Sequence, residues 1–445
     1  MSVELEKEPR VIVDGKFFRL GGKKFFPKGV CYSPFCPDSY GFCFPSQEQV
    51  ERDIELIKEL GANILRIYNI PPRWFVDLIA QKGLKLLIDI PLPTHLCFLD
   101  YPKEIEDARA NVRKTVQSFA GHPAIFAYSL ANEIKPDIAR WSGAEKINSF
   151  INSLVEEAKN IDAGCLCTFG NYPPTEYLAP SAIDFYCFNV YLHQQKPFEN
   201  YLARLQMIAN AKPIILGETG IDSIREGEDA KCEMLKWQIY TTFKSGFAGI
   251  FIFSLTDDWY RGGRKITDWA MGITNANREK KPSFYTVQQE FNASPYYPLN
   301  KYPKVSVVVA CYNGARTLKA CLDSLFQLNY PNYEVILVDD GSTDATPQIA
   351  RLYSKLRCIR QKNYGLSVAR NTGISMAVGE IVAFTDADCR ADEDWLYYLV
   401  SDLERGEFVG IGGPNLLPPE DSPIAAAVMA SPGGPAHVML TDRIA

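Results

Sequence analysis

The chain has 445 residues, 47% apolar and 22% charged. This length exceeds what one hydrophobic core supports, so we expect at least two folded domains, and the apolar fraction excludes extensive disorder. The 47 basic and 53 acidic residues leave a net charge of −6 with both signs interspersed, which excludes a polybasic surface for nucleic acid.

Neither a targeting segment nor a membrane segment is visible. The start, MSVELEKEPR, is polar, and apolar runs such as GIFIFSL and VSVVVACY are too short to cross a bilayer. The 12 cysteines are scattered along a chain without a secretory signal, which favours free, mostly buried thiols. We therefore expect a soluble, cytoplasmic chain.

The first half alternates apolar runs with amphipathic helical segments. The opening VIVDGKFFRLGGKKFF has turn residues at 14–15 and 21–22, which predicts a hairpin closing the bottom of a barrel. Strands that alternate with helices pair in parallel, and eight such units in about 250 residues predict a closed (β/α)₈ TIM barrel. The eight runs are FFPKGVCYS, NILRIYNI, LKLLIDIPL, IFAYSLANEI, LCTFGNY, DFYCFNVYL, PIILGETG and GIFIFSLTDDW.

Two glutamates follow strands of this predicted barrel, Glu133 after the fourth run and Glu218 after PIILG in the seventh. Chemistry in such barrels lies at the carboxyl ends of the strands. One glutamate there can simply be solvated or salt-bridged, but two on strands four and seven can face each other across the mouth. Such a pair can flank a glycosidic bond, one protonating the leaving oxygen and one attacking the anomeric carbon, if their environments separate their pKa values.

These motifs resemble the retaining glycoside hydrolases of the (β/α)₈ clan that contains β-galactosidases, β-glucuronidases and cellulase-like enzymes, over roughly residues 10–290. GKKFFPKGVCYSP is similar to the entry strand of those barrels, LANE to the clan's Asn-Glu pair, and GETG to its nucleophile strand. The resemblance implies Glu133 as acid/base, Glu218 as nucleophile, and Asn132 as a ligand of the sugar 2-hydroxyl.

The same resemblance implies three further substrate-site residues. Tyr191 in FNVY corresponds to a tyrosine that hydrogen-bonds the nucleophile, Arg66 in LRIYN to an arginine beside it, and Trp259 in LTDDWY to a sugar-stacking aromatic. A structural ion pair for Arg66, a rim position for Tyr191 and plain packing for Trp259 remain alternatives. The β-sandwich domains that precede the barrel in β-galactosidases are not found, so glucanase or glucanosyltransferase activity is equally open, and transfer competes with hydrolysis.

A segment without periodicity, FNASPYYPLNKYPK, contains three prolines and is interpreted as a linker. We expect a barrel domain at 1–290, a linker at 291–303 and a second domain at 304–445. That domain restarts a strand and helix succession with VSVVVACYN, TLKACLDSLFQL, YEVILVDDGS, ATPQIARLYSKL and IVAFTDAD. Its polar strand endings fall where open α/β sheets bind ligands.

The last of these runs ends in Asp386 and Asp388, one residue apart. Two such carboxylates can converge on a hard divalent cation that also binds phosphates, although the pattern alone equally fits a solvated turn. VSVVVACYNGARTLKACLDSLFQLNYPNYEVILVDDGSTDAT resembles the nucleotide-sugar half of processive, inverting family-two glycosyltransferases with the Rossmann-like GT-A fold. The resemblance implies that Asp386 lies near the ribose and metal, and that Asp388 binds Mg²⁺ or Mn²⁺.

The resemblance also implies a nucleotide-sugar site for a UDP-sugar. Asp339 and Asp340 have an Asx-turn as their alternative, and Arg370 a surface position. The implied nucleotide-sugar residues are Ala310, Tyr312, Asp339, Asp340, Gly365, Arg370, Asn371 and Asp386.

The features that follow this half in the family are not found: the catalytic base, the acceptor-side helices, a Gln-x-x-Arg-Trp motif and transmembrane helices. Since the chain ends at HVMLTDRIA, we expect a truncated transferase domain from a longer synthase that is membrane-associated through its missing part, with both domains on the cytosolic side.

The sequence thus predicts a bifunctional carbohydrate-active protein. A retaining glycoside hydrolase or transglycosylase would act on a β-linked oligo- or polysaccharide without a cofactor, beside a glycosyltransferase domain that uses a nucleotide sugar and Mg²⁺ or Mn²⁺. Two alternatives stay open: a hydrolase with an inert transferase fragment, and a non-catalytic sugar-binding barrel that serves a polysaccharide synthase.

Overall fold

The computed structural model describes residues 9–93, 95–404, 409–413 and 415–417, and residues 422, 424, 427 and 428. The chain divides into two compact units, Met1–Tyr297 and Pro298–Ala445, called here the barrel unit and the C-terminal unit. The division falls after helix α9, which extends to Ala293, so the first three residues of the segment 291–303 are helical. The terminal HVMLTDRIA lies outside the described residues.

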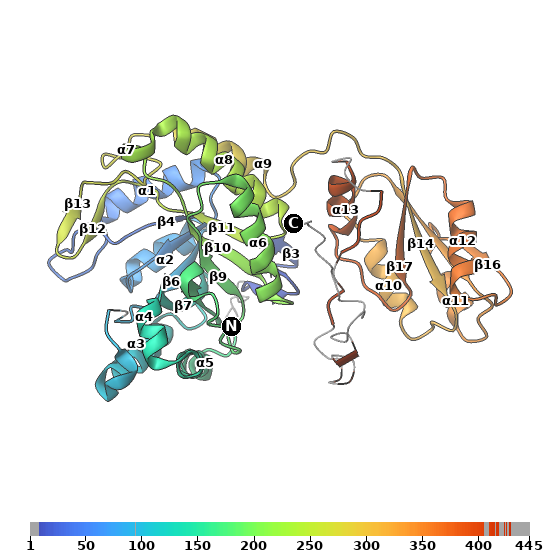
Figure 1. The fold of residues 1–445 in the computed structure, drawn as a ribbon, viewed down its shortest axis with the longest axis horizontal. Coiled ribbons are helices and arrows are strands. Elements are labelled where there is room, and N and C mark those ends of the chain that lie inside the picture. Colours follow the sequence, from blue (N-terminus) through green and yellow to red (C-terminus); the bar gives the residue numbers. More distant parts are fainter. Residues whose placement is uncertain are drawn as a thin grey trace, which may run out of the picture. The chain divides into compact units, whose positions relative to one another are not determined.

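The barrel unit contains the eight-stranded barrel that the sequence predicts. Eight parallel strands close in the order β10-β11-β4-β5-β6-β7-β8-β9 (Figure 1), so the predicted fold class is confirmed. The strands are β4 (Lys28–Cys31), β5 (Ile64–Ile67), β6 (Lys85–Asp89), β7 (Ile125–Asn132), β8 (Leu166–Asn171), β9 (Tyr186–Asn189), β10 (Ile214–Thr219) and β11 (Gly249–Ile252).

Helices surround the barrel, and most of the longer ones bury one apolar face against it. In α1, Ser46 caps the first turn by accepting a hydrogen bond from Gln49 N, and Val50, Ile54 and Ile57 form the buried face at helical spacing. The helices are α1 (Gln47–Glu59), α2 (Arg73–Gln81), α3 (Pro102–Phe119), α4 (Pro136–Ser142), α5 (Ala144–Ile161), α6 (Gln195–Ala209), α7 (Ser223–Glu226), α8 (Glu228–Lys244) and α9 (Pro282–Ala293), with short 3₁₀ turns η1 (Phe98–Asp100) and η2 (Pro173–Thr175).

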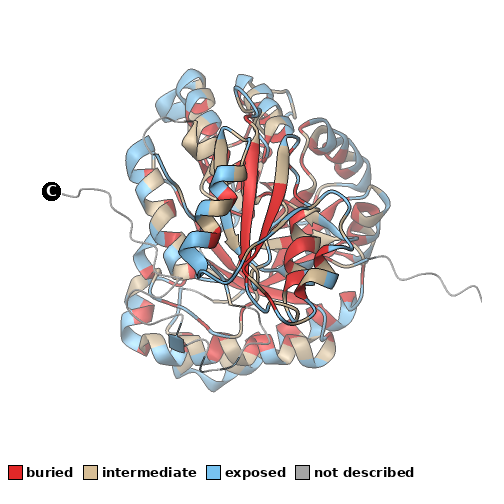
Figure 2. Cartoon of the chain, turned by 90° about the vertical axis from the view of Figure 1, so that its right-hand side faces the viewer, coloured by how far each residue is buried: buried red, intermediate tan, exposed pale blue. Residues whose placement is uncertain are grey.

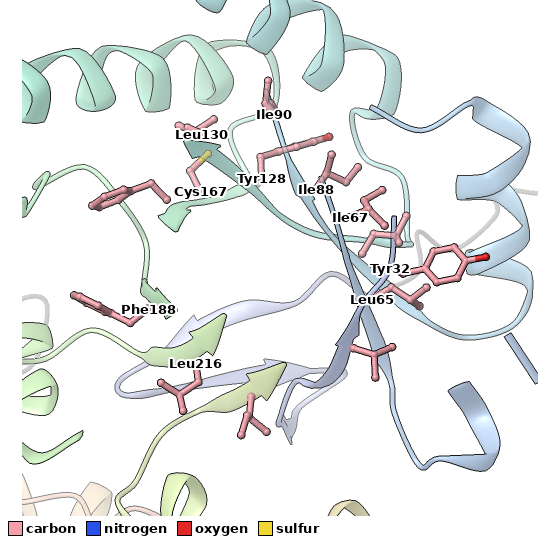
Figure 3. Packing of buried hydrophobic residues seen from close by; sticks show 14 of the residues in the cluster. Tyr32, Leu65, Ile67, Ile88, Ile90, Tyr128, Leu130, Cys167, Phe188 and Leu216 are labelled. Atoms are coloured by element: carbon pink, nitrogen blue, oxygen red, sulfur yellow. The ribbon is translucent and has the colours of Figure 1, made fainter. Parts of the chain in front are cut away.

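Alternation along the strands decides which side chains enter the barrel. Leu65 and Ile67 of β5 belong to the cluster that packs against the helices (Figure 3). Ile64 belongs instead to a second cluster, which fills the barrel. Arg66, in phase with Ile64, therefore points inward, although it is charged and fully buried.

The predicted N-terminal hairpin is a three-stranded antiparallel sheet, β1 (Ile12–Asp14), β2 (Phe17–Leu20) and β3 (Lys23–Phe25). The fully buried ring of Phe18 meets Phe126 and Phe185 edge-on, with centroids 5.0 and 5.2 Å apart. Both phenylalanines stand where barrel strands begin, so this sheet covers the amino-terminal end. At the opposite end, β11 is followed by a hairpin of β12 (Trp259–Arg261) and β13 (Arg264–Ile266).

The C-terminal unit contains a parallel sheet in the order β16-β15-β14-β17, the Rossmann-like arrangement expected from the sequence. The central strands are rich in valine and isoleucine and are buried; they appear red in Figure 2. Helices α10, α11 and α13 pack on one face and α12 on the other. The elements are β14 (Val305–Cys311), β15 (Tyr333–Asp339), β16 (Arg357–Arg360), β17 (Ile381–Asp386), α10 (Leu318–Leu325), α11 (Thr346–Ala350), α12 (Leu366–Met376) and α13 (Trp395–Leu403).

Strand order places the ligand-binding edge of this sheet. The chain runs from β14 through β15 to β16 on one side and returns to β17 on the other, so the order reverses at β14. Open α/β sheets bind ligands at the carboxyl ends of strands beside such a reversal. The register pairs Cys311 with Asp339 and Ala310 with Asp386, which brings both predicted acidic positions to that edge.

All twelve cysteines are free, and six of them are buried. Among the residues that the structure describes, no helix is long and apolar enough to span a membrane.

Candidate active sites

Glu218 lies on β10 at the mouth of the barrel and is 6% exposed. The hydroxyl of Tyr68 donates to its Oε1 and the hydroxyl of Tyr191 to its Oε2, each at 2.7 Å, and Arg66 Nη1 lies 3.3 Å from Oε1. Removal from water raises the pKa of Glu218 to about 7; the charge on Glu133 adds to this rise, while Arg66 and the tyrosine hydroxyls oppose it. The carboxylate is thus held by two hydroxyl donors and one ion pair, and its pKa of about 7 lies near neutral pH.

Arg66 is held by a network inside the barrel. Its guanidinium donates to both oxygens of Asp89, at 2.7 and 3.0 Å, to Asn189 Oδ1 at 2.8 Å and to Asn132 Oδ1 at 2.9 Å. A planar guanidinium with several donors suits this geometry better than an ammonium would. A Cβ on Gly217 would lie 2.6 Å from Arg66 Nη1, so only glycine fits there.

Glu133 directly follows β7 and lies on the same ring of strand ends as Glu218. Its φ of +48° is uncommon for a non-glycine residue, and its N–H donates to Gly170 O of β8 at 2.8 Å. Asn189 Nδ2 donates to Glu133 Oε1 at 2.9 Å, and the backbone of Asn189 pairs with that of Glu218. Asn189 therefore links the two glutamates.

Asn132 has a fixed orientation beside Glu133. Its Oδ1 accepts hydrogen bonds from Arg66 and from Asn189 Nδ2, the latter at 3.1 Å. Both contacts use the amide oxygen, so Nδ2 is the group of Asn132 that remains able to donate to a ligand.

Trp259 is placed differently from the sequence expectation. Strand β11 ends at Ile252, and Trp259 begins the following hairpin, 7% exposed, with its indole N–H donating to Ser254 Oγ and Thr256 O. Its ring packs on Phe253 at 4.7 Å and Tyr68 at 5.9 Å between centroids. Trp259 thus supports the aromatic wall beside Glu218 and presents little ring surface of its own.

In the C-terminal unit, Asp340 organises the turn at the end of β15. Its carboxylate, 3% exposed, accepts hydrogen bonds from Gln361 Nε2 at 2.7 Å, Tyr364 N at 3.0 Å and Gly365 N at 2.8 Å. Removal from water raises the pKa of Asp340, but these hydrogen bonds outweigh that effect and the pKa is lowered. Asp340 therefore ties the start of α12 to the sheet edge.

Asp339 is also buried, at 1% exposure. Its Oδ1 accepts from Ser342 N, three residues further along the chain, at 2.9 Å, and Arg360 Nε lies 3.5 Å from Oδ2. Ala310 is 9% exposed and Tyr312 54% exposed at the end of β14.

Arg370 and Asp386 meet at this edge, where Arg370 Nη2 donates to Asp386 Oδ1 at 2.7 Å. Asp388, two residues on, is exposed, as is Asn371 on α12. Within the described ranges, no group of three or more acidic, histidine or cysteine side chains could hold a metal ion by itself.

Comparison with known proteins gives a different family match for each of the two units. Residues 306–422 match the sequence model of glycosyl transferase family 2, and residues 1–162 match that of a glucanosyltransferase family. The chain joins a glycoside hydrolase-like barrel to a family 2 glycosyltransferase domain. The resemblances seen in the sequence are thereby confirmed at the level of family.

Individual relatives match only parts of the chain. A putative glycosyltransferase, EpsH of Bacillus subtilis, is 44% identical over 98 residues, and a poly-β-1,6-N-acetyl-D-glucosamine synthase of Staphylococcus epidermidis is 33% identical over 118 residues. These matches cover 21% and 25% of this chain, and 27% and 29% of those proteins. The chain thus spans less than a third of the length of these curated relatives.

Solved structures similar to the chain share the fold of the barrel. A β-glucuronidase of Ruminococcus gnavus with D-glucuronic acid has a TM-score of 0.56 at 18% identity, and a β-galacturonidase of Eisenbergiella tayi has 0.54 at 21%. The matches cover 64% and 65% of this chain and 52% and 55% of those chains. Identity at this level shows the fold alone.

Several site residues of the glycoside hydrolase-like barrel escaped sequence analysis: Tyr68, Asp89, Asn189 and Phe253. Tyr68 had a usable signal, because it stands two residues after Arg66 and so faces the same way. Asp89 and Asn189 also had one, as buried polar residues at the ends of apolar runs need partners. Phe253 gave no signal within GIFIFSL.

Proposed function

We propose that the barrel unit cleaves or transfers β-linked glycosides with retention of configuration, with Glu218 as nucleophile and Glu133 as acid/base. The observation that carries this proposal is the clamp on Glu218, in which two tyrosine hydroxyls and Arg66 hold a carboxylate while Asn189 holds Glu133. Such fixed positioning is what attack on an anomeric carbon requires.

In the proposed reaction, one oxygen of Glu218 bonds to the anomeric carbon as the bond to the leaving oxygen breaks, and Glu133 gives that oxygen a proton. Glu133 then takes a proton from water or a sugar hydroxyl, which displaces Glu218 and restores both groups. Asn132 Nδ2 would donate to the sugar 2-hydroxyl, and Arg66, held by Asp89, would favour the ionised form of Glu218 against the effect of burial on its pKa.

The decisive experiment measures hydrolysis of aryl β-glycosides and β-glucans, with product configuration followed by NMR. Glu218→Ala should abolish activity, Glu133→Gln should lose mainly the substrates with poor leaving groups, and Glu199→Ala on the outer helix α6 should change nothing. Inverted products, or activity that survives Glu218→Ala, would refute the assignment. Inactivity on every substrate would instead favour a sugar-binding barrel.

We propose that the C-terminal unit binds a nucleotide sugar, a UDP-sugar, at the carboxyl edge of its sheet. The residues are those that the fold gathers there: Ala310, Tyr312, Asp339, Asp340, Gly365, Arg370, Asn371 and Asp386. Asp386 and Asp388 fit Mg²⁺ or Mn²⁺, because such ions at phosphate sites take one or two carboxylates and complete their shell with phosphate and water. The ion would neutralise charge on the departing diphosphate.

Titration of UDP with and without Mn²⁺ tests this second site. Asp388→Ala should remove the metal-dependent part of the affinity, while Asp323→Ala, on the outward side of α10, should leave it intact. If Asp388→Ala binds UDP and Mn²⁺ as wild type does, the metal assignment is wrong.

Together the two units would synthesise and remodel one β-linked polysaccharide. We propose that both work on the cytosolic side, because nucleotide sugars are found there, and that a longer form of the protein is membrane-associated. UDP binding without metal-dependent transfer to any acceptor would support the alternative in which only the barrel is active.

A further inference from the structure

The β12–β13 hairpin is a two-stranded ribbon that carries three cations. Gly262 and Gly263, with φ of +60° and +79°, form its two-residue turn, which matches the twist of the strands. The register places Arg261 opposite Arg264 and Tyr260 opposite Lys265.

Among the residues that the structure describes, one of these three cations has an ion-pair partner. Lys265 pairs with Asp258 at 2.9 Å, whereas the exposed Arg261 and Arg264 form no ion pair with any residue that the structure describes. Like charges directly opposite each other destabilise a two-stranded ribbon. A bound anion would relieve this repulsion, and guanidinium groups bind carboxylates in a bidentate manner.

The hairpin stands at the catalytic mouth of the barrel. Its first residue, Trp259, packs on Tyr68, which donates to Glu218, and Arg261 follows two residues later, about 7 Å along a strand. The N–H of Tyr260 donates to Pro34 O at 3.0 Å, so the hairpin lies against the loop 33–45 that follows β4 (Figure 1).

That loop presents an exposed aromatic ring on a turn whose backbone is hydrogen-bonded. Tyr40 is 85% exposed, yet Asp38 Oδ1 accepts hydrogen bonds from Tyr40 N at 2.8 Å and Phe42 N at 2.9 Å. Phe35 N and Cys43 O close the base of the loop at 3.1 Å. A ring on an ordered turn loses little entropy when a ligand covers it, which suits it to contact the apolar face of a sugar.

We propose that the hairpin and the loop 33–45 bind an anionic β-linked glycan, whose carboxylate groups contact Arg261 and Arg264 while a neighbouring sugar lies on Tyr40. The carboxylate groups of the glycan would therefore be bound by residues other than Glu133 and Glu218. It rests on the proposed function only in taking a glycan as the ligand of the barrel mouth.

The test measures binding, so it needs no turnover. The full chain carrying Glu218→Gln is titrated with a β-linked polyglucuronate and with a neutral β-glucan of equal length. The acidic glycan should bind at least about tenfold more tightly, and R261S/R264S should lose about that factor for it while binding the neutral glycan unchanged. Raising salt from about 0.05 to about 0.5 M should shrink the preference. Y40S should weaken both glycans.

K114S/K236S, which removes the same charge from the outer helices α3 and α8, is the matched control. Equal loss in this control, equal loss of the neutral glycan in R261S/R264S, or no binding of either glycan would overturn the inference. Equally tight binding of a sulfated dextran would show a general polyanion surface and overturn the carboxylate assignment. Inactivity toward aryl glycosides would contradict the proposed catalysis alone, because the binding assay contains no catalytic step.

Discussion

The hydroxyl of Tyr68 donates a 2.7 Å hydrogen bond to Oε1 of Glu218, and this bond to a charged acceptor has a measurable consequence. Removing it with Tyr68→Phe should lower kcat by about 10- to 100-fold, because a hydrogen bond to a charged group contributes about 1.5–3 kcal/mol. Tyr240→Phe, on the outer helix α8, is the control. Unchanged kcat in Tyr68→Phe would show that Tyr191 and Arg66 are sufficient to position Glu218.

The acidic limb of the pH–rate profile should report the ionisation of Glu218. Because burial raises the pKa of Glu218 to about 7, the attacking carboxylate is protonated below that pH, so kcat/KM for aryl glycosides with good leaving groups should fall as pH drops through 7. Tyr68→Phe removes a donor to the charged form and should move this limb to higher pH. A limb near pH 4.5 would mean that Glu218 titrates like an exposed carboxyl group.

The same pKa predicts that ionised Glu218 destabilises the fold at alkaline pH. Glu218 has a folded pKa above its unfolded value of 4.5, so the stability it contributes is present below pH 4.5 and is lost as pH rises through 7. Glu218→Gln cannot ionise and should be more stable than wild type by about 3 kcal/mol at pH 8, but hardly so at pH 4.5.

Tryptophan fluorescence during denaturation can measure this difference, because five of the six tryptophans lie in the barrel unit: Trp74, Trp141, Trp237, Trp259 and Trp269. If Glu218→Gln were more stable than wild type by the same amount at every pH, the cause would be packing and not ionisation.

Much of this arrangement follows from strand ends. Eight apolar runs predict the barrel, and strand alternation turns Arg66 toward its interior, in phase with Ile64. The position of Glu218 needs the structure, because Leu216 faces the helices and a register shift between Leu216 and Glu218 changes the alternation of β10. Trp259 shows the limit of this reasoning: GIFIFSL continues without a break signal into LTDDWY, whereas β11 ends at Ile252 and the ring of Phe253 packs on Trp259.

The C-terminal unit shows a second limit. The sequence predicts Asp340 at a strand end, but two of its three donors are the backbone N–H groups of Tyr364 and Gly365, 24 and 25 residues away. Backbone donors leave no mark in a sequence, so the Asx-turn and the long-range contact could not be told apart before the fold was known.

Arg66 and Asp89 form a buried ion pair. Removing one partner should therefore cost more stability than removing both. Arg66→Met leaves Asp89 charged and unpaired and should destabilise the barrel unit by about 3–5 kcal/mol. Arg66→Met combined with Asp89→Leu removes both charges and should recover a large part of that loss. Denaturant titration of the three proteins checks this, and a double variant less stable than Arg66→Met would show that the other contacts of Asp89 dominate.

Asp340 and Asp388 should contribute to nucleotide binding in different ways. Asp340→Ala releases three donors that hold the start of α12 against β15, so it should weaken UDP binding to the same extent with and without Mn²⁺. Asp388→Ala changes an exposed residue and should remove only the metal-dependent affinity, with unfolding unchanged. Asp340→Asn keeps an acceptor oxygen and should restore part of the loss. If Asp340→Ala also abolished the effect of Mn²⁺, the turn and the metal site would act as one unit, and the separate roles assigned here would be wrong.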